Sequence, residues 1–119
     1  MKKEPEFCQF QEALGILVGK WKPVILVHLL NDGTQRFSVL KRKMPGITQR
    51  MLTKQLRELE DEDIIQRVIY PEIPPKVEYS ITEYGRSLEP ILEAMHEWGS
   101  SHVARKQAEE PEAQEEKLS

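Results

Sequence analysis

The sequence has one cysteine, Cys8, and no long apolar run. One cysteine cannot form a disulfide within the chain, so a disulfide-stapled fold is excluded. The longest apolar stretch, Val24–Leu30, is interrupted by His28 and is far shorter than the roughly 18 residues that a membrane-spanning helix needs. No apolar signal segment follows the charged residues 1–6. We therefore expect a cytoplasmic protein without membrane association.

Signatures of catalysis and of metal binding are also missing. The three histidines are scattered through the chain without an i, i+4 pair, and a single cysteine gives no zinc knuckle. Neither a glycine-rich phosphate loop nor a nucleophile elbow occurs. The 119 residues are enough for one domain. We expect neither an enzyme nor a protein that carries a metal or another cofactor.

Acidic residues are absent between Gly33 and Arg57, although the formal net charge of the chain is −3. This stretch holds seven basic residues: Arg36, Lys41, Arg42, Lys43, Arg50, Lys54 and Arg57. The segment 107–119 instead holds five glutamates and one lysine. A concentrated basic segment on a nearly neutral body is typical of a phosphate-binding surface, although a charge run can also be only a solvated helix face.

The apolar spacing predicts two helices and a short strand in the first part of the chain. Residues 8–18 have the spacing of one helix. Pro23 lies where a second helix begins, and the run 24–30 is apolar nearly all round, which favours a central place in the core. The stop signal at 31–33 precedes a short extended segment at 34–37.

Two hydroxyl residues are expected to cap the next helices. Ser38 begins a short third helix, and Thr48 begins a fourth helix that runs to about Glu62. One stripe of the fourth helix is apolar, with Leu52, Leu56 and Leu59. The opposite face is polar, with Arg50, Thr53, Lys54 and Arg57.

A hairpin and a last long helix complete the pattern. Strands at 64–70 and 76–81 flank a proline-stiffened tip, and Thr82 is expected to cap the final helix. The order of helix, helix, short strand, helix, helix, hairpin and helix predicts an α+β, mainly α, winged helix-turn-helix fold. We expect a flexible arm at 1–7, the winged helix domain at 8–106 and an acidic, disordered tail at 107–119.

Five stretches carry a resemblance to a known family. They are Gly-Lys-Trp-Lys-Pro at 19–23, Arg-Phe-Ser at 36–38, Pro-Gly-Ile-Thr-Gln-Arg-Met-Leu-Thr at 45–53, Leu-Arg-Glu-Leu-Glu at 56–60 and Tyr-Pro-Glu-Ile-Pro-Pro-Lys-Val-Glu-Tyr-Ser-Ile-Thr at 70–82. Over roughly residues 8–99 the chain resembles the HxlR family of MarR-like bacterial regulators. The resemblance implies a homodimeric winged-helix DNA-binding protein in which the N- and C-terminal helices build the dimer.

The resemblance also bears on Cys8. Some members of the family sense oxidants, quinones or aldehydes through a cysteine near the start of the first helix, where Cys8 lies. Gln9 stands where family members often have proline, a departure that concerns sensing and not DNA binding. Cys8 is therefore either a reactive thiolate, whose disulfide would have to be intermolecular, or an inert cysteine at the dimer interface.

The fourth helix is the expected recognition helix for the major groove of double-stranded DNA. The residues expected to contact bases are Gln49, Arg50, Thr53 and Lys54. The residues expected to contact the DNA backbone are Arg36, Ser38, Lys41, Thr48 and Arg57. Lys76, with Arg67 as a further candidate, places charge on the wing.

The dimer is expected to bind a pseudo-palindromic operator with half-sites about one helical turn, or a multiple of it, apart. The expected interface residues are Phe10, Leu14, Leu88, Ile91, Met95 and Trp98. The function that follows is a transcriptional regulator, most simply a repressor, switched by thiol oxidation or electrophile modification at Cys8. The alternatives are a regulator that responds to a non-covalent small ligand and a winged-helix protein-interaction module without DNA binding.

Overall fold

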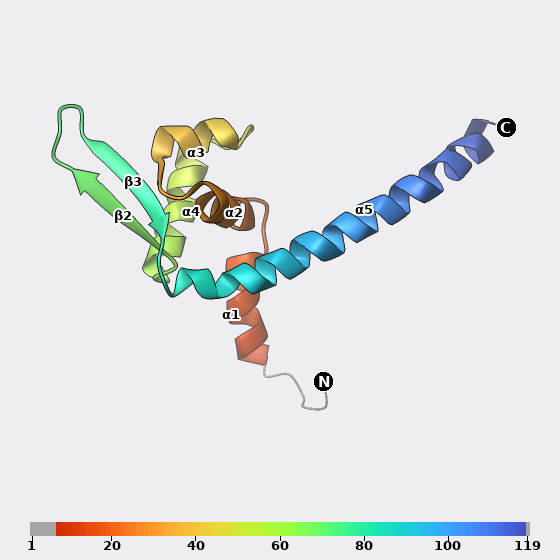
Figure 1. Cartoon of the computed structure of the whole chain (residues 1–119), viewed down its shortest axis with the longest axis horizontal. Coiled ribbons are helices and arrows are strands. Elements are labelled where there is room, and N and C mark those ends of the chain that lie inside the picture. Colours follow the sequence, from red (N-terminus) through yellow and green to blue (C-terminus); the bar gives the residue numbers. More distant parts are fainter. Residues whose placement is uncertain (1–6, 119) are drawn as a thin grey trace. The chain divides into compact units, whose positions relative to one another are not determined.

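The computed structural model describes the backbone of residues 7–118 and the side chains of residues 9–109 (Figure 1). Its elements are α1 (Phe7–Leu17), α2 (Lys22–Asp32), β1 (Gln35–Arg36), α3 (Phe37–Lys43), α4 (Gln49–Asp61), β2 (Ile65–Tyr70), β3 (Lys76–Ile81), the short 3₁₀ helix η1 (Gly85–Leu88) and α5 (Glu89–Leu118). This order confirms the predicted winged helix-turn-helix. The chain divides into two compact units, one ending at Ser87 and one beginning at Leu88.

The core of the first unit joins three helices to the base of the sheet. Its most completely buried side chains are Ile25, Leu26, Leu29, Leu40, Met44, Leu52, Leu56, Leu59, Ile64 and Ile65. The leucine stripe predicted for α4 is thus confirmed. Burying each such side chain contributes about 1.5–3 kcal/mol, which makes this stripe the main attachment of α4 to the domain.

The central place in the core that was expected for α2 holds for one face of the helix. Ile25, Leu26 and Leu29 are buried, but Val24 and Val27 are each 39% exposed. Helix α2 packs mainly against α1, α4 and β3 of this unit, and Lys43 of α3 contacts Asp32 at its end. Helix α2 therefore has more apolar side chains than its neighbours in this unit bury.

The sheet has three antiparallel strands in the order β1-β3-β2. The register of the hairpin runs from the pair Ile65 and Ile81 at its base to the pair Tyr70 and Lys76 next to its tip. In the edge strand β2 only Ile65 is buried. The hairpin is therefore anchored at its base and projects as the wing (Figure 1).

The predicted caps have different outcomes. The Thr48 cap is confirmed, because its Oγ1 accepts a hydrogen bond from the backbone N–H of Met51 at 3.0 Å. The Ser38 cap is wrong. Strand β1 runs straight into α3 at Phe37, so Arg36 occupies the capping position and Ser38 already lies in the first helical turn.

Thr82 caps the turn before the last helix and not that helix itself. Its Oγ1 accepts a hydrogen bond from the N–H of Gly85 at 2.9 Å, where η1 begins. The same hydroxyl donates to the carbonyl oxygen of Asp63 at 2.6 Å. Gly85 lies so close to the carbonyl of Ile64 that a Cβ atom has no room there. These contacts fix the end of the hairpin.

Helix α5, in the second unit, exposes an apolar stripe. Ile91 and Met95 are each 45% exposed and Trp98 is 69% exposed, at helical spacing. The indole of Trp98 stacks on His102 with ring centroids 4.9 Å apart. Helical backbone continues through 107–118, but the side chains beyond Glu109 are outside the described residues, so the tail boundary stays a prediction.

No single helix within residues 7–118 is long and apolar enough to cross a membrane. Among the described residues, the segments Gln9–Leu17 of α1 and Lys22–Asp32 of α2 reach the length and composition of a span when taken together, but they are bent by 68° at the break between them.

Candidate nucleic-acid interface

The outer face of α4 is polar and open. A shallow hollow along it is lined by Gln49, Arg50, Thr53, Lys54, Arg57 and Glu58. Arg50, Lys54 and Arg57 are exposed, and they form no ion pair in the part of the chain whose side chains are described. The leucine stripe fixes the helix on its opposite side, so these cations lie on a rigid element and remain available to a ligand.

Thr53 differs from its neighbours on this face. Its Oγ1 donates a hydrogen bond to the carbonyl oxygen of Gln49 at 2.8 Å, and its side chain is half-buried. Because the hydroxyl is engaged within the helix, its proton is not available to a base, and the methyl group is the other group that Thr53 can offer to DNA. A threonine methyl can contact the methyl group of thymine.

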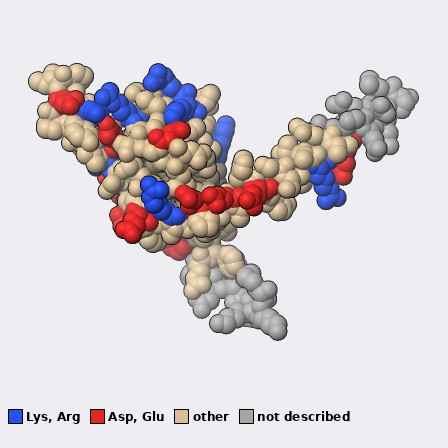
Figure 2. Space-filling view, in the orientation of Figure 1, with Lys and Arg blue, Asp and Glu red and all other residues tan. Residues whose placement is uncertain are grey.

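Helix α3 adds a second set of exposed basic residues. Arg36, Ser38 and Lys41, the residues expected to contact a DNA backbone, are all exposed, and so is Arg42; contact with DNA stays a prediction for each of them. Lys and Arg gather over α3 at the top of the space-filling view (Figure 2). The cationic surface of the helix-turn-helix therefore extends from α4 onto α3.

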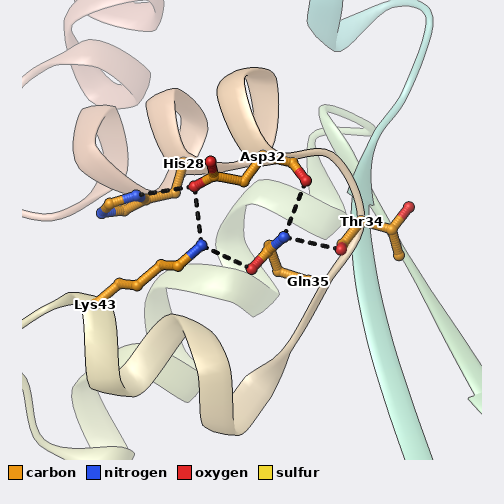
Figure 3. Close-up of polar contacts among 5 residues, drawn as sticks. All are labelled: His28, Asp32, Thr34, Gln35 and Lys43. Carbon is orange, nitrogen blue, oxygen red and sulfur yellow. Dashed lines mark hydrogen bonds and ion pairs between the residues drawn. The ribbon is translucent and has the colours of Figure 1, made fainter.

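One basic residue of the acid-free stretch has an acidic partner from outside it. Lys43 Nζ lies 2.9 Å from Asp32 Oδ2 and donates to Gln35 Oε1 at 3.0 Å (Figure 3). His28 Nδ1 lies 3.7 Å from the same carboxylate oxygen. The hydrogen bond from Lys43 lowers the pKa of Asp32. This cluster ties the end of α3 to the end of α2 and offsets the charge of Asp32 next to the cationic surface.

The cations of the wing are paired. Lys76 Nζ lies 2.9 Å from Glu78 Oε1 and 5.0 Å from the ring centroid of Tyr70. Arg67 Nε lies 3.8 Å from Glu60 Oε2. The tip at 71–75 has no basic residue, and its Ile73 side chain is fully exposed. DNA contact by Lys76 stays a prediction, and it would require Lys76 to leave or share Glu78.

Lys22, the first residue of α2, was not among the residues expected in the site. Its Nζ lies 2.7 Å from Glu58 Oε2 on α4 and donates to the carbonyl oxygen of Gly15 at 3.2 Å. The hydrogen bond from Lys22 is the largest cause of a lowered pKa at Glu58. Lys22 lies in the stretch 19–23, which carries part of the family resemblance. The residues around it in the sequence nevertheless do not indicate that its partner, Glu58, lies on a distant helix.

The expected dimer residues are exposed on their own elements. On α1, Phe10 is 45% and Leu14 51% exposed, and Val18 follows at the same spacing with 61%. Leu88 is half-buried at the end of η1. The backbone of Cys8 belongs to α1, whereas its side chain is outside the described residues. Across the described residues, no three His, Cys, Asp or Glu side chains gather to hold a metal ion.

The fold and the cationic face of α4 define a winged helix-turn-helix protein. The model of the HxlR-like helix-turn-helix family matches residues 16–107, so the chain belongs to that family. This membership makes the chain a helix-turn-helix transcriptional regulator and not an enzyme, with DNA binding implied by the family.

Three proteins show how similar the chain is to known regulators. The transcriptional regulator YtcD of Bacillus subtilis is 51% identical over 105 residues, which cover 88% of this chain and 82% of YtcD. The structure of the redox regulator HypR in its reduced form is 48% identical, with a TM-score of 0.78, over 84% of this chain and 98% of HypR. The diamide-treated YodB of B. subtilis is 34% identical, with a TM-score of 0.68, over 82% of this chain and 96% of YodB.

Proposed function

We propose that the chain is a homodimeric repressor that binds a pseudo-palindromic operator with α4 in the major groove. The observation that carries this proposal is the pair of opposite faces of α4. One face is a buried leucine stripe, and the other exposes Arg50, Lys54 and Arg57, which form no ion pair with any described side chain. Free cations on a fixed helix suit the phosphates and base edges of duplex DNA.

The residues of the interface divide into three roles. Gln49, Arg50, Thr53 and Lys54 lie in the N-terminal half of α4 and are assigned to base edges. The assignment to sugar and phosphate covers Arg36, Ser38, Lys41, Thr48 and Arg57. Lys76 is assigned to the DNA beside the wing. Thr48 serves twice in this scheme, because its hydroxyl caps α4 next to N–H groups that attract anions.

The dimer is proposed to form through α1 and α5. Each helix carries an apolar stripe that stays exposed in the single chain: Phe10 and Leu14 on α1, and Ile91, Met95 and Trp98 on α5. Leu88 precedes the second stripe. Apolar stripes of this kind are typical of contact surfaces.

Sedimentation of variants tests the dimer. Met95→Glu puts a charge into the stripe of α5 and should shift the protein from dimer to monomer. Glu93→Gln, a change on another side of the same helix, should leave the dimer intact. A Met95→Glu protein that remains as dimeric as the parent would contradict the proposed interface.

The regulatory step is proposed to be oxidation at Cys8. Support comes from the similar HypR structures in reduced and oxidised forms and from the diamide-treated YodB structure. With one cysteine per chain, the thiols of two chains would form one S–S bond and pass two electrons and two protons to the oxidant. A small electrophile would instead bond to a single thiolate.

The first experiment is binding of the reduced protein to the DNA upstream of its own gene, across a salt series. Phosphate contacts predict a log–log salt slope of about −0.9 per contact. The measurement is repeated with diamide and with Cys8→Ser. Loss of binding with diamide only in the protein that has Cys8 supports the thiol switch.

Two other outcomes select the alternatives. If diamide leaves DNA binding unchanged, Cys8 is not an oxidant sensor. If a Cys8→Ser protein still responds to its inducer, the regulator responds to a non-covalent ligand. Failure to bind this DNA or any duplex from a random pool would favour a protein-interaction module.

A further inference from the structure

Lys22 links three helices of the first unit through one ammonium group. It is the first residue of α2, and its Nζ lies 2.7 Å from the Glu58 carboxylate on α4. The same Nζ donates to the carbonyl oxygen of Gly15 in α1 at 3.2 Å. The Lys22 side chain is 15% exposed, compared with 41% for that of Glu58. The ammonium group is thus held from two sides, whereas the carboxylate it contacts still reaches solvent.

Glu58 is the one carboxylate among the side chains that line the hollow on α4. Lys54 lies four residues earlier, so the two side chains are neighbours on the helix surface. The charge of Lys54 also contributes to the lowered pKa of Glu58, after the contact with Lys22. If Lys22 were absent, Lys54 would be the nearest cation on α4 with which Glu58 could pair.

We propose that Lys22 is a positioning residue for DNA binding: by pairing with Glu58, it leaves Lys54 unpaired and neutralises the carboxylate that lines the DNA-facing hollow. This inference rests on the proposed function of α4. It assigns Lys22 a role in recognition without contact to DNA. Without Lys22, the Glu58 carboxylate on this face would repel phosphate and would compete with DNA for Lys54.

Four variants test the proposal by fluorescence anisotropy with the upstream duplex. Lys22→Met should weaken binding by roughly two- to fivefold for a dimer, the size of one exposed ion pair per chain. It should also reduce the salt slope by up to about 0.9 per chain, because Lys54 is withdrawn from phosphate. Glu58→Gln should bind as tightly as the parent or more tightly. The double variant Lys22→Met with Glu58→Gln keeps the parent net charge and should restore parent affinity.

Lys20→Met is the matched control for charge. Lys20 Nζ lies 4.7 Å from the ring centroid of Trp21. Lys20 forms no ion pair with a carboxylate among the described side chains. The change removes the same charge two residues away and should leave the affinity close to that of the parent. An equal loss in Lys20→Met and Lys22→Met would overturn the proposal in favour of a simple net-charge effect.

Three further results would overturn it. A double variant as weak as Lys22→Met would mean that Lys22 contacts DNA itself, and a Lys22→Met protein with parent affinity would mean that Glu58 needs no partner. The third is a loss of affinity in Glu58→Gln, which would mean that the ion pair acts only through stability. This variant decides the question even if Lys22→Met lowers the melting temperature, because neutralisation of Glu58 by Lys22 predicts no loss of affinity in Glu58→Gln. Failure of the parent protein to bind DNA is a separate result, which removes the proposed function itself.

Discussion

Helix α4 and the β2–β3 hairpin both carry basic residues, yet they offer different amounts of usable charge. On α4, Arg50, Lys54 and Arg57 are unpaired within the described structure. On the hairpin, Lys76 faces Glu78 and Arg67 faces Glu60. A cation that already has a carboxylate must give it up to bind phosphate. The basic residues of a sequence therefore overstate the charge that its fold makes available.

The two regions also differ in how they are attached. A continuous stripe of buried leucines holds α4 along its length, whereas β2 buries only Ile65 at the base of the hairpin. A rigid support favours accurate placement of side chains against bases, and a projecting hairpin suits adaptable contact. We therefore expect α4 to carry sequence discrimination and the wing to carry a minor share of the affinity.

The largest expected effect is a loss of folding stability when a buried residue of α4 is truncated, compared with truncation of an exposed residue of the hairpin. Leu52→Ala removes a fully buried side chain of α4 and should lower the free energy of unfolding by about 2–5 kcal/mol. Ile69→Ala removes a side chain of the hairpin that is 56% exposed and should cost less than about 0.5 kcal/mol. Urea unfolding followed by circular dichroism measures both. Equal losses would mean that the hairpin is covered in the protein as it exists in solution.

The next effect concerns DNA recognition by α4. Arg50→Ala should weaken binding to the operator by about 1–3 kcal/mol and relax the preference at one base pair, since a bidentate contact to guanine has this value. Arg86→Ala removes an exposed arginine of η1 and serves as the control with the same charge change. Anisotropy with operator and mutated-operator duplexes measures both. Similar losses in the two variants would remove Arg50 from the base-contacting set.

The elements were predictable from the sequence because their signals are local. Proline at the start of α2, the Thr48 cap and the leucine spacing of α4 each act within a few residues. The Ser38 cap failed because β3 pairs with β1 as far as Arg36, and this pairing decides where α3 begins. A strand pairing that joins distant segments cannot be inferred from the residues near a helix start.

The partners of charged residues were the least predictable part of the site. Lys22 and Glu58, or Arg67 and Glu60, meet only after the helices and the sheet have packed. The sequence identified every exposed cation of α4 but could not tell which other cations would be neutralised. The composition of α2 likewise gave no sign that Val24 and Val27 would stay partly exposed.

A smaller effect concerns the anchored base of the hairpin. Burial raises the pKa of Tyr79 above its ordinary value of 10.0. The unfolded chain then loses this proton at lower pH than the folded protein does, so stability should fall as pH rises above 10. Tyr79→Phe should flatten this part of the profile, whereas Tyr84→Phe, at a 63% exposed residue, should not. An unchanged profile in Tyr79→Phe would assign the alkaline loss of stability to other groups.

The smallest expected effect is at the wing. Lys76→Ala should weaken operator binding by less than about 1 kcal/mol, because its ammonium is already paired with Glu78. If this pairing is what limits the wing, Glu78→Gln should release Lys76 and strengthen binding slightly, with a steeper salt dependence. Anisotropy at two salt concentrations measures both variants. A Lys76→Ala loss as large as that of Arg50→Ala would mean that Lys76 exchanges Glu78 for phosphate at little cost, and the wing would then rank with α4 as a source of affinity.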